Sequence, residues 1–141
     1  MPEIISGKLP SQAYIALGFD FGSKKIGVAS GQSLTGTASP IDIIKANNGI
    51  PNWDDIGKLV QQWQPQLIIV GLPLNMDGTE SDLSLRAKKF ARRLAANYSC
   101  AVGLMDERLT SREARELLSH NGQVDHIAVV LILESWFNSN S

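Results

Sequence analysis

Acidic residues at the ends of hydrophobic runs are the positions in this sequence most suited to chemistry. Asp20 ends the run YIALGFDF, and Asp106 and Glu107 end the run AVGLMDE. A carboxylate that leaves water needs a partner, a hydrogen bond or a metal. Adjacent strand residues point to opposite faces, so only one of the second pair can face Asp20, and we favour Glu107. Asp125 stands before the last apolar segment, where an aspartate also serves as a helix N-cap.

Three carboxylates that meet from separate elements repel one another unless a divalent cation or a shared proton offsets their charge. Mg²⁺ and Mn²⁺ suit oxygen-only ligands. Two such ions about 3.5 to 4 Å apart would activate a water and stabilise the leaving oxygen in phosphodiester hydrolysis. The alternative is that Asp106 and Glu107 are exposed strand-end charges paired with Arg108 or Arg112.

A second set of residues could contact phosphates. In the loop GLPLNMDGTES, backbone N–H groups and the Asn75 amide would face a phosphate at the start of a helix, although an ordinary Asp77-Gly78 turn explains the loop equally well. Basic helix faces are usually only solvated. We nevertheless expect substrate contacts from Lys24, Arg86, Lys89, Arg93, Arg108 and Arg112. Core positions fit the three tryptophans better than base-stacking platforms do: Trp53, Trp63 and Trp136.

Short strands dominate the first part of the chain. Residues 14–21 and 25–30 read as two strands joined by a tight turn, and 37–45 as a third, where Pro40 favours a sheet edge. These three predict an antiparallel meander. The next elements are a helix between Asn52 and Pro65, a strand over 67–71, a helix from a cap at Thr79 to about Tyr98, and a strand over 101–107.

The C-terminal part is predicted to be helical. The capping box of Thr110 to Glu113 opens a helix that stops near Asn121 and Gly122. The apolar run VDHIAVVLILESWF has the β-branched residues of a strand but the length of a buried helix, and we favour the helix.

This order predicts an α/β fold with a mixed five-stranded sheet, three antiparallel strands followed by parallel ones, flanked by helices. Strand 14–21 should lie beside strand 67–71. The crevice at the carboxyl ends of these strands is where such sheets bind ligands.

Size and composition set the class of protein. The 141 residues suit one domain, and no apolar run approaches the length that spans a bilayer. A secretory signal is not apparent in residues 1–13, so we expect a cytoplasmic protein. The lone Cys100 cannot form an internal disulfide and suits core packing in a strand. Net charge is −1, but eight of the thirteen Lys and Arg lie between Arg86 and Arg115, which indicates a basic patch.

The chain resembles the YqgF (RuvX) family, the bacterial RNase H-like proteins described as Holliday junction resolvases or pre-16S rRNA nucleases. The motifs FDFGSKKIGVASG, GTASPI, IIVGLPLNMDGTES, RAKKFARRL, DERLTSREA and VDHIAVVLILESWF follow in the family's order. The resemblance implies an RNase H-like fold, a divalent-metal site formed by Asp20, Glu107 and Asp125, and phosphodiester cleavage in nucleic acid, pre-rRNA or branched DNA. Symmetric cleavage of a junction would favour a homodimer with two related sites.

One difference from the family lies before Asp125. Family members usually carry a longer, basic loop there, whereas only Gln123 and Val124 follow Gly122 in this chain.

Two other functions remain open from the sequence. A non-catalytic RNA-binding factor in ribosome assembly would use the basic patch and keep its affinity without metal. A nucleotide-dependent phosphotransferase is suggested because DFGSKKIGVA also resembles the first phosphate motif of the actin and sugar-kinase superfamily, although the chain has room for only one of the two lobes of those enzymes.

Overall fold

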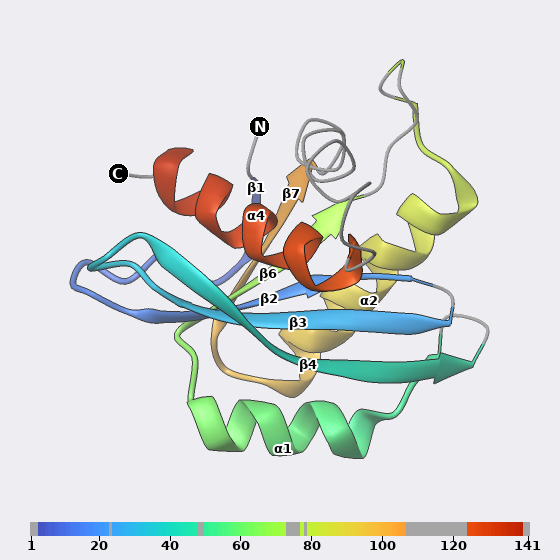
Figure 1. Cartoon of the computed structure of the whole chain (residues 1–141), viewed down its shortest axis with the longest axis horizontal. Coiled ribbons are helices and arrows are strands. Elements are labelled where there is room, and N and C mark those ends of the chain that lie inside the picture. Colours follow the sequence, from blue (N-terminus) through green and yellow to red (C-terminus); the bar gives the residue numbers. More distant parts are fainter. Residues whose placement is uncertain are drawn as a thin grey trace.

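The computed structural model describes residues 3–22, 24–47, 50–72, 77, 79–106 and 124–139, and its elements follow the predicted order (Figure 1). The strands are β1 (Glu3–Ser6), β2 (Ile15–Asp20), β3 (Lys25–Gln32), β4 (Thr37–Asn47), β5 (Ile50–Pro51), β6 (Leu67–Leu72) and β7 (Ala101–Asp106). The helices are α1 (Trp53–Trp63), α2 (Asp82–Asn97) and α4 (Val124–Ser139). The helix predicted over 110–122 lies outside the described residues.

The strands form one seven-stranded mixed sheet in the order β1-β7-β6-β2-β3-β4-β5. β2, β3 and β4 are the predicted antiparallel meander, and β2 runs parallel to β6, which runs parallel to β7. The mixed sheet and the neighbouring of β2 and β6 are therefore confirmed. β1 and β5 extend the five predicted strands; they have four and two residues, too few for a clear alternation in sequence. Pro40 pairs with Ala29 on the inner side of β4 only, as expected near a sheet edge.

Each face of the sheet has its own core. Leu17 and Phe19 point to the face covered by α1 and α2, where Phe90 and Leu94 of α2 pack on them. Ala16 lies on the other face, under Leu133 of α4. Figure 1 shows α4 on one side of the sheet and α1 on the other. The last segment is thus a helix, and its middle is apolar where it packs across β2, β3, β4 and β6.

Helix starts follow their capping residues, with one correction. The Asn52 side chain accepts a hydrogen bond from the backbone N of Asp54 at 3.1 Å, as predicted for α1. The cap of α2 is Ser81 instead of Thr79, since Ser81 and Ser84 form a reciprocal capping box. Thr79 donates instead to the Asp77 carboxylate, through both its backbone N and its hydroxyl.

Two further predictions need correction. Asp125 is the second residue of α4 and does not precede the helix, because α4 begins at Val124. Cys100 precedes β7 instead of lying within it, although it does pack, half-buried, against the core beneath α1 and α2. No helix in the described part of the chain is long and apolar enough to cross a membrane.

Candidate functional site

Asp20 is the last residue of β2 and lies between two strands that carry glycine beside it. Its register partners are Gly27 on β3 and Gly71 on β6. Residues that pair across neighbouring strands lie on the same face, so neither cross-strand partner of Asp20 adds a side chain beside it. Asp20 itself is half-buried. The two glycines leave room beside this carboxylate for another group.

Strand alternation places Asp20 on the α4 face of the sheet. Leu17 and Phe19 belong to the core beneath α1 and α2, whereas Ala16 belongs to the core beneath α4. Because successive side chains point to opposite faces, residue 20 shares the face of residue 16. The candidate site is therefore at the carboxyl edge of the sheet, on the side that α4 covers.

The end of β7 lies at the same edge. Asp106 is in register with Leu72 of β6, one residue beyond the pair of Gly71 with Asp20. Met105 packs in the α4-side core, and Leu104 in the other core. Glu107 comes directly after β7 but lies outside the described residues, as does the side chain of Asp106, so the choice between these two carboxylates stays a prediction.

The direction of α4 brings its first turn toward Asp20. A Cβ on Gly31 would meet the ring of Phe137 at 2.8 Å, and one on Gly18 would meet Leu133 Cγ at 2.7 Å. Gly31 is the partner of Ala16 across the sheet, so the contacts move along β2 toward Asp20 as α4 is followed back toward its start. Asp125 lies on the first turn of α4, and its side chain is outside what the structure describes.

Of the three predicted metal ligands, Asp20 has a side chain within the described part of the chain. Among the residues that the structure describes, no three His, Cys, Asp or Glu side chains are grouped so that they could hold a metal ion. Two of the three predicted ligands, Glu107 and Asp125, have side chains outside that part. Asp20 and the end of β7 lie at one edge of the sheet, and the contacts of α4 run along β2 toward that edge.

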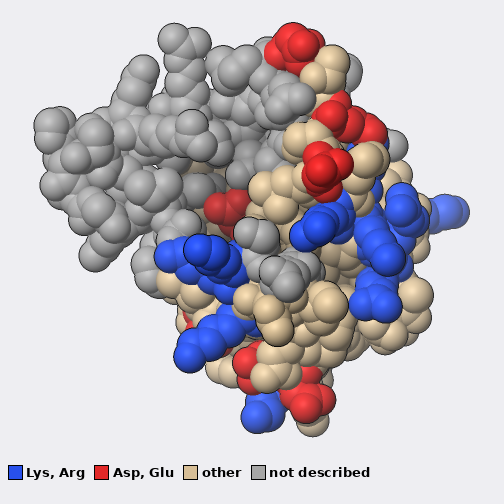
Figure 2. Space-filling view, turned by 90° about the vertical axis from the view of Figure 1, so that its right-hand side faces the viewer, with Lys and Arg blue, Asp and Glu red and all other residues tan. Residues whose placement is uncertain are grey.

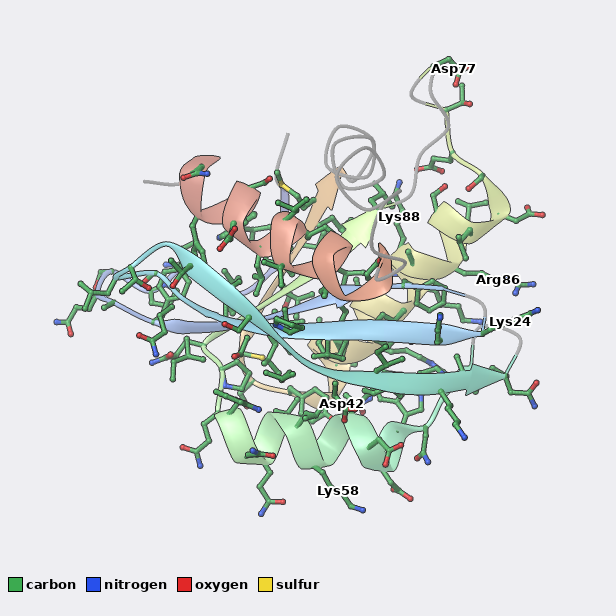
Figure 3. All side chains as sticks on the ribbon, viewed as in Figure 1. Lys24, Asp42, Lys58, Asp77, Arg86 and Lys88 are labelled. Atoms are coloured by element: carbon green, nitrogen blue, oxygen red, sulfur yellow. The ribbon has the colours of Figure 1, made fainter. Side chains whose placement is uncertain are left out.

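Four of the predicted substrate contacts lie within the described residues. Lys24 is exposed in the turn after β2, where its carbonyl accepts a hydrogen bond from Ala46 N at 2.8 Å. Arg86, Lys89 and Arg93 line a hollow beside α2. Figure 3 shows Lys24 and Arg86 at the same end of the molecule. Asn75, Arg108 and Arg112 lie outside the described residues.

Two more lysines, not predicted as substrate contacts, lie beside Lys24; the three together are called the basic end. Lys25 and Lys45 are register partners on β3 and β4, next to the turn that carries Lys24. They are distant in the sequence, so only strand pairing could reveal that they meet. Figure 2 shows Lys and Arg side chains gathered on this end of the molecule. The positive charge lies beyond the strand end that carries Asp20, where a polyanion would reach both.

Tyr98 and Cys100 lie just before β7, at the opposite end of that strand from Asp106. Burial raises the pKa of the Cys100 thiol above its ordinary value. Burial also raises the pKa of the Tyr98 hydroxyl, and Cys100 adds to that shift. Neither group is a candidate for the chemistry at Asp20.

Comparison with known proteins covers nearly the whole chain. Residues 14–139 match the family described as RuvX, Holliday junction resolvase. The chain belongs to the RuvX family. A RuvX relative from Shewanella denitrificans, described as a "Putative pre-16S rRNA nuclease", is 53% identical over 131 residues, covering 87% of this chain and 93% of the relative. A relative from Pasteurella multocida with the same description is 56% identical over 131 residues, covering 87% and 94%.

Solved structures similar to this RuvX chain confirm its RNase H-like fold. The Fowlpox virus resolvase in complex with Holliday junction DNA has a TM-score of 0.53 at 16% identity, covering 89% of this chain and 98% of the resolvase. T. thermophilus RuvC in complex with a Holliday junction substrate has a TM-score of 0.52 at 15% identity, covering 89% and 94%. At such identities the likeness concerns the fold alone.

Proposed function

We propose that this RuvX-family chain is a metal-dependent nuclease that hydrolyses phosphodiester bonds in structured nucleic acid. The 5′ end of pre-16S rRNA, processed during ribosome biogenesis, is the first substrate, and four-way DNA junctions are the second. The observation that carries the proposal is the position of Asp20: half-buried, at the carboxyl edge of the sheet, with glycine on both flanking strands. Relatives more than half identical, described as pre-16S rRNA nucleases, favour the RNA substrate.

Asp20, Glu107 and Asp125 are the residues that would hold Mg²⁺ or Mn²⁺, because their oxygens match the preference of these ions. When bound, the ions would supply an activated water and charge stabilisation at the leaving oxygen. The chain also positions the nucleic-acid substrate. Lys24, Lys25 and Lys45 present positive charge beyond the end of β2 and neutralise phosphates of the substrate.

The experiment compares wild type with Asp20→Asn on two substrates, 5′-extended 16S precursor RNA and a four-way DNA junction, each with Mn²⁺, Mg²⁺ or EDTA. Asp42→Asn is the matched control. Asp42 is an exposed residue of β4, and its carboxylate accepts a hydrogen bond from the backbone N of its neighbour Ile43. We expect metal-dependent cleavage that Asp20→Asn lowers at least about a hundredfold and Asp42→Asn leaves unchanged. Equal cleavage by Asp20→Asn would show that the site is misassigned.

The basic end also favours a second candidate, a non-catalytic RNA-binding factor. Such a protein would bind precursor RNA in EDTA, with an affinity that falls steeply with salt and is the same in Asp20→Asn. Absence of cleavage on both substrates together with this binding would select it. Symmetric cleavage of a junction would further require two copies of the site, which sedimentation of the protein with and without junction DNA would detect.

A further inference from the structure

A second feature suited to nucleic acid lies on the other face of the sheet from α4. A hollow of about 160 Å³ opens between β5, the start of α1 and the middle of α2. Its lining residues are Ile50, Pro51, Trp53, Arg86, Lys89, Phe90 and Arg93. A shallower depression bordered by Trp53, Arg93, Ala96 and Asn97 continues it along α2. The hollow is on the opposite face of the sheet from Asp20, because Phe90 in its wall packs on Phe19 and Phe21, the residues on either side of Asp20.

The wall of the hollow is a fixed aromatic surface. Phe90 is 3% exposed, and its ring packs against Phe19 and Phe21 with centroid distances of 5.6 and 5.3 Å. The Trp53 ring lies 5.6 Å from Phe90, tilted by 40°. Trp53 is only half-buried, so part of this indole borders the open space. An aromatic ring held from behind in this way gives a ligand a flat surface at little cost in side-chain entropy.

The rim of the hollow is cationic. Arg86, Lys89 and Arg93 are exposed and stand at positions i, i+3 and i+7 of α2, so they share one face of the helix. No Asp or Glu is among the lining residues that the structure describes. Lys88, on a different side of α2, forms an ion pair with Glu80. The charged lining residues that the structure describes are thus all basic, which favours an anionic ligand.

The dimensions suit a single aromatic ring. A protein cavity of about 150 Å³ accepts a benzene molecule, so a hollow of this size and openness accepts one base of a nucleotide. Ile50, which is 64% exposed at the mouth, adds apolar surface beside Trp53. An aromatic surface combined with cations is the pattern that binds single-stranded nucleic acid, the bases stacking and the backbone contacting the cations.

We propose that this hollow binds an unpaired nucleotide of the substrate, with its base on Trp53 and its phosphates on Arg86, Lys89 and Arg93. The proposal rests on the proposed function for the class of ligand. It deepens that function, since the site would select substrates with a single-stranded segment next to the duplex, such as the unpaired end of a precursor RNA.

The test is the affinity of the full chain for a short fluorescent oligouridylate in EDTA, so that no cleavage occurs. The variants are Trp53→Leu, Trp53→Phe and Arg93→Gln, with Arg92→Gln as the matched control, because Arg92 is exposed on the same helix but does not line the hollow. We expect Trp53→Leu to weaken binding about tenfold and Trp53→Phe to weaken it less. Arg93→Gln should weaken binding and reduce the salt slope by about one, whereas Arg92→Gln should match wild type.

An abasic strand of the same length and charge tests the base contact in the unaltered protein, even if Trp53→Leu does not fold. We expect it to bind wild type about tenfold more weakly than oligouridylate. Equal binding of the two strands, or an Arg93→Gln variant that binds like Arg92→Gln, would overturn the proposal.

The outcome is independent of the cleavage assay. If Asp20-dependent cleavage occurs while oligouridylate binding is the same in all variants, the hollow is wrongly assigned and the nuclease function stands. If no cleavage occurs but binding depends on Trp53 and Arg93, the nuclease function is wrong and the nucleotide site stands.

Discussion

Leu133 of α4 packs directly on Gly18 of β2: a Cβ on residue 18 would lie 2.7 Å from Leu133 Cγ. Both are in the interior, and Leu133 is fully buried. Gly18 comes two residues before Asp20 and shares its face of the sheet. The contact therefore sets how closely α4 lies on β2, and with it the distance from the first turn of α4 to Asp20.

Replacing Gly18 with Ala should lower the free energy of unfolding by about 1 to 3 kcal/mol, because the added methyl forces Leu133 and α4 away from the sheet. Cleavage should also fall, since Asp125 moves with α4. Urea unfolding measures the first effect and the precursor-RNA assay the second. Gly57→Ala is the control: its Cβ would lie 3.6 Å from the Tyr98 hydroxyl, an ordinary contact, and alanine within α1 should stabilise by about 0.5 to 1 kcal/mol. A Gly18→Ala protein as stable as wild type would contradict this account of the packing.

Asp20 should be needed for metal affinity as well as for cleavage. Titration of the protein with Mn²⁺, followed by calorimetry, should show binding that Asp20→Asn weakens at least about tenfold and Asp42→Asn does not change. Circular dichroism spectra of the two variants should be the same, because Asp20 is at a strand end. Unchanged Mn²⁺ binding in Asp20→Asn would separate this carboxylate from the metal site.

Glu134 connects α4 to the long strand β4. Its Oε2 accepts a hydrogen bond from the backbone N of Ala38 at 3.1 Å. Glu134→Ala removes the acceptor, so the partly buried backbone N–H of Ala38 loses this hydrogen bond. The free energy of unfolding should fall by about 1 to 3 kcal/mol. Glu134→Gln keeps an oxygen at this position and should cost less. Thermal unfolding of both variants checks the order, and equal losses would mean that the hydrogen bond does not contribute.

Ser81 should matter more than Thr79 for the stability of α2. Ser81→Ala removes the N-cap and should lower the free energy of unfolding by about 1 kcal/mol. Thr79 contacts Asp77 in an exposed loop, so Thr79→Ala should change stability by less than half as much. Denaturant midpoints measure both, and a larger loss in Thr79→Ala would restore the cap expected from sequence.

Cys100 should react slowly with alkylating reagents. Burial raises its thiol pKa above the ordinary 9.0, so at pH 8 the thiolate fraction is smaller than in a free cysteine. The rate of iodoacetamide modification should be below that of a free thiol at pH 8 and should still rise with pH above 9. Mass spectrometry follows this single thiol, since the chain has one cysteine. A rate that levels off below pH 9 would contradict the shift.

Much of the fold could be predicted because it rests on local patterns. Two short segments on either side of a tight turn predicted β2 and β3, and Asn52 with Pro65 bounded α1. The predicted cap of α2 is two residues too early because Thr79 and Ser81 are similar caps in sequence, and the structure decides between them: Ser81 forms a capping box with Ser84, whereas Thr79 donates to Asp77. Asp20, Glu107 and Asp125 were predicted as metal ligands from their positions at strand and helix ends and from the resemblance to the RuvX family, and these roles stay predictions.

Local spacing and residue type were enough to specify five of the strands, β2, β3, β4, β6 and β7, the helices α1, α2 and α4, and the aspartate that ends β2, since these depend on neighbours within a few residues along the chain. The glycines beside Asp20, the pairing of Lys25 with Lys45 and the hollow that joins Trp53 to Arg93 depend on the register of strands and the packing of helices far apart in sequence. Such contacts form only when the strands pair and the helices pack on both faces of the sheet. Each joins two segments far apart in sequence, and neither segment alone indicates its partner.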